Sequence, residues 1–258
     1  MGSFTGSNFV NIDTPFSLVD GCLFAQLVDL FDHGLAAGFD GYTKTYEKIW
    51  SDLRRCVDRC HKDGAIKLQV AKDPKKYIIY DQNLFPMLKS FREAGKKIFL
   101  LTNSLWDYTQ VVMNYLEDKK VHDSVDLKWT EYFDIIITGG NKPAFLEDEG
   151  SLQLFRVDPI TYALTHNDNI PSDSKELKNY FSLGKIFQGG NAKTLYNLLQ
   201  ITSGDRLLYV GDHVYADVLR SKRTLGWRTV LIVPELTSEI LSHKKSKSKK
   251  EMILKYRF

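Results

Sequence analysis

The sequence predicts an α/β fold in which a mostly parallel sheet follows a helical segment. From about residue 81 onward, short apolar runs alternate with segments whose apolar residues recur at helical spacing, the alternation that builds parallel sheets. A second observation is the apolar run at 207–211, which ends in Gly-Asp and is followed five residues later by another acid. A buried strand with acids at its carboxyl end is typical of the ligand-binding edge of such a sheet.

Composition narrows the class of protein. Of the 258 residues, 43% are hydrophobic and 26% are charged, which are ordinary values for a soluble globular protein. The net charge of +3 is too small to indicate nucleic acid, and no apolar run approaches the roughly 20 residues of a membrane helix. Three cysteines without metal-like spacing favour a reducing compartment. We therefore expect a cytosolic protein with neither a nucleic-acid nor a membrane partner.

Residues 1–80 are predicted to form a helical segment. Apolar residues recur at helical spacing in two stretches, 16–31 and 43–61. Arg54, Asp58 and His61 lie on related turns of the second helix. They either line one face of a pocket or form an exposed polar face, and periodicity alone favours the exposed face.

Residues 81–240 are predicted to form the sheet and its covering helices. The expected strands are 98–103, 133–138, 207–211 and 229–233. The expected helices are 84–94, 108–115, 191–199 and 217–225. The segment 144–190 is polar and turn-rich, so we expect an excursion with at most short strands. Residues 241–258 form a basic tail, typical of a disordered and solvated segment, with a nuclear signal or a contact to an acidic surface as the alternative.

Polar groups follow three of the predicted strands. Thr102 supplies a hydroxyl, Lys142 a cation, and Asp212 and Asp217 two carboxylates. Parallel strand ends share one edge of a sheet, so these groups are expected to converge. Carboxylates are ligands for Mg²⁺, and the whole set fits a phosphoryl group, whose transfer requires charge neutralisation and positioning. Alternatively, Asp212 caps the next helix and Asp217 is a solvated helix residue.

At these residues the chain resembles the haloacid-dehalogenase-like (HAD) phosphatases and, within them, the cytosolic purine 5′-nucleotidase family with its domain-containing relatives. The stretch from Leu100 to Thr109 resembles the second motif of that family, and Asn141-Lys142-Pro143 resembles the third. The stretch 209–222, followed by 226–229, resembles the fourth. The resemblance runs from about residue 11 to residue 240, and it implies a Rossmann-like parallel core with a helical cap.

The resemblance also implies roles for individual residues. Thr102 would hold the phosphate, Lys142 would neutralise it, and Asp212 would bind Mg²⁺ with support from Asp217. A purine nucleoside monophosphate would lie against the cap. The residues that match its pocket are Phe16, which would stack on the base, together with Arg54, Asp58, His61, Lys67, Asn103 and Ser104.

One motif of the family is absent. The family's reaction begins with an Asp-x-Asp pair on the first strand, where the first Asp attacks phosphorus and the second protonates the leaving oxygen, and the 258 residues contain no such pair. We therefore expect a shortened copy of the fold that lacks its first strand and has little or no activity. That strand would lie between the strands that end at Asp212 and at Thr102, so its absence would leave two open strand edges facing each other.

Two functions follow from this resemblance. The first is a Mg²⁺-dependent phosphatase of purine nucleoside monophosphates, present here as a weakly active or inactive copy. The alternative is a non-catalytic nucleotide-binding or regulatory module that pairs with a full-length relative or with a second copy of itself. A receiver-like phosphoacceptor would also have an acidic strand end, but receivers lack the cap and the 144–190 excursion.

Overall fold

The computed structural model describes residues 10, 12, 15–34, 45–118, 126–147, 153–166, 170–171 and 173–255. The side chains of residues 15, 16, 174 and 247–255 lie outside this description. Within the described ranges, none of the helices combines the length and the apolar character needed to span a bilayer.

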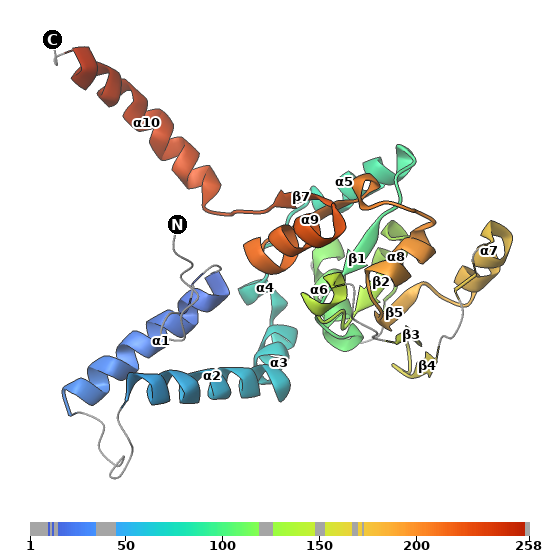
Figure 1. Ribbon diagram of the computed structural model, residues 1–258, viewed down its shortest axis with the longest axis horizontal. Coiled ribbons are helices and arrows are strands. Elements are labelled where there is room, and N and C mark those ends of the chain that lie inside the picture. The colour runs from blue at the N-terminus through green and yellow to red at the C-terminus, as the bar shows by residue number, and fades with distance from the viewer. Residues whose placement is uncertain are drawn as a thin grey trace.

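The largest element is a five-stranded sheet with the order β1-β2-β5-β3-β4 (Figure 1). Three parallel strands form one half of it: β1 (Phe99–Leu101), β2 (Ile135–Thr138) and β5 (Ile186–Gly189). An antiparallel hairpin of β3 (Leu154–Val157) and β4 (Leu164–His166) adds to the free side of β5. The predicted fold class, a mostly parallel α/β core, is therefore confirmed.

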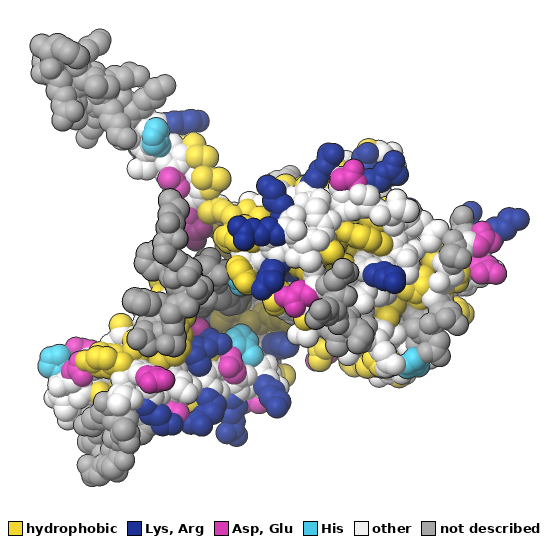
Figure 2. All heavy atoms as spheres, viewed as in Figure 1, with side chains coloured by type: hydrophobic (Ala, Val, Ile, Leu, Met, Phe, Trp, Pro, Cys, Tyr) yellow, Lys and Arg dark blue, Asp and Glu magenta, His cyan; other side chains and the backbone are white. Residues whose placement is uncertain are grey.

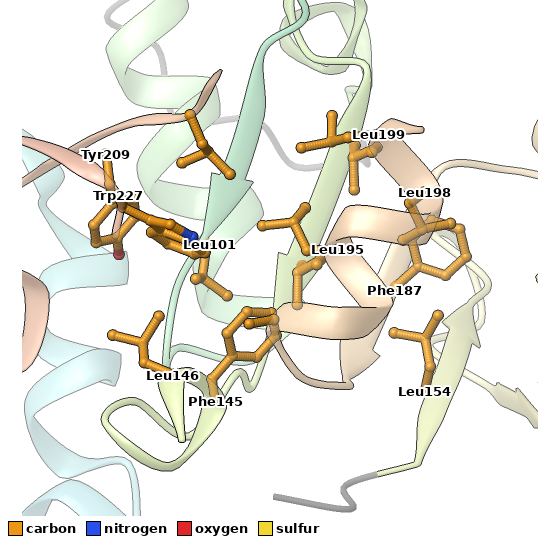
Figure 3. Close-up of a cluster of buried hydrophobic side chains, with 14 of the residues drawn as sticks. Leu101, Phe145, Leu146, Leu154, Phe187, Leu195, Leu198, Leu199, Tyr209 and Trp227 are labelled. Carbon is orange, nitrogen blue, oxygen red and sulfur yellow. The ribbon is translucent and has the colours of Figure 1, made fainter. Parts of the chain in front are cut away.

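Alternation along the strands sends neighbouring side chains to opposite faces of this sheet. On one face, Ile135 and Ile137 join a buried cluster with residues of α7 (Ser174–Ser182) and α8 (Ala192–Leu199) (Figure 3). On the other face, Ile136 packs with residues of three helices. These are α5 (Leu84–Glu93), α6 (Trp106–Asp118) and the 3₁₀ helix η1 (Lys128–Tyr132). The core therefore has three layers, with the sheet in the middle.

A second, two-stranded sheet carries the Gly-Asp stretch. It pairs β6 (Leu208–Gly211) with β7 (Arg228–Leu231) in parallel, and η3 (Gly204–Arg206) precedes it. Among the described strands, none pairs with the outer edge of β1 or of β6. Side chains join the two sheets instead, since the ring of Phe99 on β1 stacks on that of Tyr209 on β6 at a centroid distance of 6.2 Å. Over the described residues, the outer edges of β1 and β6 thus carry no paired strand. The prediction of a buried strand at 207–211 was wrong for half of β6, since the side chains of Leu208 and Val210 face water with exposures of 55% and 52%.

The N-terminal helices form an arm beside the core (Figure 1). They are α1 (Pro15–Asp32), α2 (Tyr46–Lys62), α3 (Ala65–Lys72) and the short α4 (Pro74–Tyr77). Thr45 caps α2 by accepting a hydrogen bond from the backbone N–H of Lys48. Phe24 of α1 meets Trp50 of α2 edge-on at 5.4 Å, which fixes the two long helices against each other.

The expectation for residues 144–190 was confirmed only in part. Its described strands are short, with three or four residues each, but the segment also supplies a helix and a strand of the core sheet. This segment contains η2 (Ala144–Leu146), the β3–β4 hairpin, α7 and the core strand β5. Only Ile186 and Phe187 are strongly apolar in the four residues of β5, a run too short to distinguish from a loop by pattern. Its place in the sheet comes from its two neighbours, which leave Phe187 fully buried.

The basic tail also differs from expectation. Residues 236–255 form a continuous helix, α10 (Leu236–Lys255), rather than a disordered segment. The stretch contains neither Gly nor Pro, and lysine has a high helix propensity, so local preference suffices to explain the helix. Figure 1 shows α10 projecting away from the core.

Candidate active site

The loops that follow β1 and β2 are joined by hydrogen bonds. The backbone N–H of Thr102 donates to the carbonyl of Ile137 at 3.0 Å, and the N–H of Gly140 donates to the carbonyl of Thr102 at 2.9 Å. The side chain of Asn103 completes the link, because its amide donates to the Lys142 carbonyl at 3.0 Å and its oxygen accepts from the Lys142 N–H at 2.6 Å. Lys142 is thus held at its main chain beside the end of β1.

The ammonium of Lys142 connects this sheet to the second one. It donates to the hydroxyl of Tyr209 at 2.7 Å and to a carboxylate oxygen of Asp217 at 2.9 Å. Both ends of the ion pair are shielded from water, with side-chain exposures of 14% for Lys142 and 6% for Asp217. The predicted convergence of strand-end groups is therefore observed for Lys142 and Asp217, and Thr102 is joined to the loop of Lys142 through its main chain.

Asp217 is placed by a turn of π-helix, η4 (Val214–Leu219), which continues into α9 (Arg220–Leu225). The carboxylate lies against Gly211, where a Cβ atom would come within 2.5 Å of it. The ring of His213 caps η4 by accepting from the N–H groups of Tyr215 and Ala216 at 3.2 Å each. The alternative interpretation was therefore wrong on both points: Asp217 is buried, and the cap is His213 rather than Asp212.

Burial and charge act in opposite directions on Lys142. Burial lowers the pKa of its ammonium, but Tyr209 and Asp217 outweigh this effect, and the pKa ends above its usual value. Burial raises the pKa of the Tyr209 hydroxyl, against the opposing effect of Lys142. At neutral pH the cluster therefore contains a charged ammonium and a protonated hydroxyl.

The candidate metal ligands lie in different environments. Asp212 follows β6 and is exposed, whereas Asp217 accepts from Lys142 and, at 3.3 Å, from the N–H of His213. Over the described ranges, no group of three or more His, Cys, Asp or Glu side chains could by itself hold a metal ion. Mg²⁺ is often held by one or two carboxylates with phosphate oxygens and water. Asp212 fits such a partial site, and Asp217 would join it only by sharing its carboxylate with Lys142.

The hydroxyl of Thr102 keeps its proton available. Its oxygen accepts from the N–H of Ser104 at 3.1 Å, and both residues are partly exposed. A hydroxyl that accepts one hydrogen bond can still donate another. Thr102 can therefore donate to an anionic oxygen at the edge where the strands end.

The predicted base-pocket residues of the arm are arranged less tightly. Arg54 contacts Asp20 of α1 and donates to Asp58 at 2.6 Å, while His61 is exposed near the end of α2. Lys67 of α3 reaches the core, with its ammonium 5.7 Å from the ring centroid of Tyr108. The side chain of Phe16 lies outside the described residues. Figure 2 shows Lys and Arg side chains gathered along this arm.

Sequence reasoning did not identify Tyr209 or Asp20 as site residues. Tyr209 could have been found, because a tyrosine at the one buried position of a strand needs a partner for its hydroxyl. Asp20 gave no such signal. It lies in an apolar helix, and its contact with Arg54 depends on how α1 and α2 pack.

Comparison with known proteins extends along nearly the whole chain. The profile of the 5′ nucleotidase family matches residues 3–257. A 5′-nucleotidase domain-containing protein of Dictyostelium discoideum is 31% identical over 226 residues, which cover 87% of this chain and 35% of that protein. The 5′-nucleotidase domain-containing protein 2 of Rattus norvegicus is 32% identical over 87% of this chain and 36% of its own length, and that of Homo sapiens is 29% identical over 87% and 38%. The chain thus spans little more than a third of the length of these relatives.

Proposed function

Because this chain belongs to the 5′ nucleotidase family, we propose that its strand-end site binds the phosphate of a purine nucleoside monophosphate, as part of a Mg²⁺-dependent 5′-nucleotidase. The observation that carries the proposal is the Lys142 ammonium, held between Tyr209 and Asp217 beside the Thr102 loop. An ammonium has three N–H donors, and two of them have partners among the described residues. The third is left for a phosphate oxygen, and Thr102 supplies a second donor.

The remaining roles in this proposal follow the resemblance. Asp212 would hold Mg²⁺, which when bound supplies positive charge against the phosphate oxygens. The nucleoside would lie toward the arm. There Lys67 contacts the ring of Tyr108 in the core, and the other predicted pocket residues are Phe16, Arg54, Asp58 and His61, with Asn103 and Ser104 at the floor. The proposal includes a cytosolic location, which the free, exposed thiols of Cys22, Cys56 and Cys60 support.

The hydrolytic step needs a nucleophile, and the 258 residues hold no Asp-x-Asp pair. We therefore propose that these residues alone bind the nucleotide without appreciable turnover, since loss of a covalent nucleophile costs several powers of ten in rate. The open edges of β1 and β6 favour a second candidate function, a nucleotide-binding module that acts with a further strand from a full-length relative or from a second copy.

Calorimetric titration of the 258-residue chain with inosine and adenosine monophosphate, in the presence of Mg²⁺, tests the binding proposal. Replacing Lys142 by Met removes a charge-assisted hydrogen bond, so affinity should fall by about tenfold to a hundredfold. Lys97→Met is the matched control, because the Lys97 ammonium donates to the carbonyl of Leu199 and Lys97 precedes β1, at the opposite end of that strand from Thr102. Equal affinity in Lys142→Met and the original chain would exclude this phosphate site.

Phosphate release separates the two candidate functions. The binding-module proposal expects no release by the chain alone and formation of a complex with a relative such as the Dictyostelium protein, measured by size-exclusion chromatography with light scattering. Release by the chain alone that is abolished by Asp212→Asn would instead support an active phosphatase.

A further inference from the structure

Tyr209 occupies a position that the phosphate-binding proposal does not by itself explain. It lies on β6 with 6% of its surface exposed, and its hydroxyl is the nearest partner of the Lys142 ammonium, at 2.7 Å. The same oxygen lies 3.4 Å from Asp217. Lysine, tyrosine and aspartate thus form a closed triangle in which the hydroxyl and the carboxylate hold the same ammonium.

The ring of Tyr209 is fixed by two aromatic neighbours. Phe99 stacks on it at 6.2 Å with an interplanar angle of 11°, and Trp227 meets it at 5.5 Å and 66°. Trp227 is held in turn by a 2.6 Å hydrogen bond from its indole N–H to the hydroxyl of Tyr196. A ring packed on two sides by rigid aromatic groups places its hydroxyl at one point, whereas the four-carbon side chain of lysine has many conformations of its own.

The two partners of Lys142 differ in what they do to its charge. Asp217 attracts the ammonium but also cancels its charge, so on its own it would draw Lys142 into a closed ion pair. The Tyr209 hydroxyl accepts a hydrogen bond without carrying charge, and it therefore holds the ammonium while leaving it cationic. A positively charged group fixed in advance is what binding of an anion requires.

We propose that Tyr209 is a positioning residue, whose hydroxyl, clamped by Phe99 and Trp227, fixes the Lys142 ammonium so that its remaining N–H is free for a phosphate oxygen. The inference rests on the proposed function for the identity of the anion. The positioning itself concerns only groups of this chain and can be measured without any ligand. Phe99 belongs to β1, Tyr209 to β6 and Lys142 to the loop after β2. The contacts of Tyr209 with Phe99 and with Lys142 therefore also hold the two sheets together at the site.

Tyr209→Phe tests the proposal, since it keeps the ring and removes only the hydroxyl. In a chain labelled with ¹⁵N-lysine, the ammonium signal of Lys142, identified by its loss in Lys142→Arg, reports how fast its protons exchange with water at one fixed pH. Removing the hydrogen bond should accelerate this exchange about tenfold. Tyr196→Phe is the matched comparison: it removes another hydroxyl of the same aromatic cluster, one bonded to Trp227 and not to Lys142. It can act on Lys142 only indirectly, through Trp227, and should change the exchange rate less than twofold.

The same variants are then titrated with inorganic phosphate. Tyr209→Phe should weaken binding about tenfold and Tyr196→Phe less than twofold. Unchanged exchange at Lys142 in Tyr209→Phe, or equal acceleration in Tyr196→Phe, overturns the positioning role. Absence of phosphate binding by the original chain overturns the proposed function instead, while the exchange measurement still decides the role of Tyr209. If Tyr209→Phe does not fold, Phe99→Leu provides a second route, because it loosens the ring and should also accelerate exchange.

Discussion

The strand-end site and the helical arm hold the same kinds of charged side chain in different surroundings. In the site, Lys142 and Asp217 form an ion pair with side-chain exposures of 14% and 6%, and tyrosine and main-chain groups complete their hydrogen bonds. In the arm, Arg54 and Asp58 form a pair with exposures of 37% and 65%. A buried ion pair must be fixed by its neighbours, whereas water screens an exposed pair and leaves it free to rearrange.

This difference separates the predicted phosphate site from the predicted base pocket. The groups at the strand ends already contact one another without a ligand. The arm residues are accessible and contact mainly each other, so a nucleoside could recruit them by breaking exposed contacts at little cost. We therefore expect stability to depend on the strand-end site and nucleotide selectivity to depend on the arm.

The largest expected effect is that of breaking the buried pair. Asp217→Asn leaves the Lys142 charge buried without its partner and should lower the free energy of unfolding by about 3–5 kcal/mol. Asp58→Asn removes one partner of the exposed pair and should cost no more than about 1 kcal/mol. Urea denaturation of both variants measures the difference, and similar losses would show that the two pairs are equally screened.

The next largest expected difference between the core and the arm is the loss of stability when a buried leucine is replaced by alanine. Leu195 of α8 is fully buried in the sheet cluster, and Leu195→Ala should cost about 3–4 kcal/mol because it leaves a cavity among packed side chains. Leu53 of α2 keeps 9% exposure, so its truncation should leave less of a closed cavity, and Leu53→Ala should cost about 2 kcal/mol. Guanidinium denaturation monitored by tryptophan fluorescence and by circular dichroism checks both values; a larger loss in Leu53→Ala would contradict the proposed contrast.

Replacing one glycine of the site and one of the arm by alanine should give a smaller difference in stability. Gly211→Ala would put a methyl group against the Asp217 carboxylate and should destabilise the chain by about 2 kcal/mol and weaken phosphate binding. Gly64 begins α3 at φ +79° with open space around it, so Gly64→Ala should cost about 1 kcal/mol from backbone strain alone and leave phosphate binding intact. Thermal unfolding and phosphate titration of the two variants measure both effects. If Gly211→Ala binds phosphate as well as the original chain, the placement of the Asp217 carboxylate does not matter for phosphate binding.

The smallest expected effect concerns pH. A hydrogen bond to the carbonyl of Asp29, with the charges of Asp29 and Asp32, raises the pKa of His33 at the end of α1. A raised pKa in the folded state means that its stabilising contribution is complete below the unfolded value of about 6.5 and is lost as pH rises through the folded pKa. The pKa values of Lys142 and Tyr209 are also raised, so their contribution is complete below about pH 10 and is lost above it.

For the arm, NMR titration of the His33 ring measures its pKa in the folded chain and in urea. The folded midpoint should be the higher of the two and should fall toward the urea value in Asp29→Asn. Denaturation of the original chain from pH 8 to 11 checks the core, where stability should decline only at the alkaline end. A decline of global stability between pH 6 and 8 that Asp29→Asn leaves unchanged would contradict this assignment.

Much of the fold was predictable because its signals are local. The strand at β6 has an apolar run bounded by a charged turn and Gly211, and β2 consists of three isoleucines and a threonine. Both patterns predict buried strands. The prediction is confirmed for β2, whereas β6 is a strand that exposes Leu208 and Val210. The strand β5 has no such run, and α10 lies in a segment whose charge suggested disorder, so context in one case and helix propensity in the other outweighed the pattern.

The sequence by itself determined the α/β class, the family and the residues that follow each strand, because motif spacing and side-chain chemistry are properties of the chain alone. Only the tertiary structure decided which of those residues meet. Lys142 and Asp217 are 75 positions apart, and their contact depends on the π-helix turn, on Gly211 and on the aromatic clamp around Tyr209. An ammonium or a carboxylate taken out of water is stable only where other groups replace its hydration. For Lys142 and Asp217 these groups come from elements far apart in the sequence, so only the folded chain can bring them together.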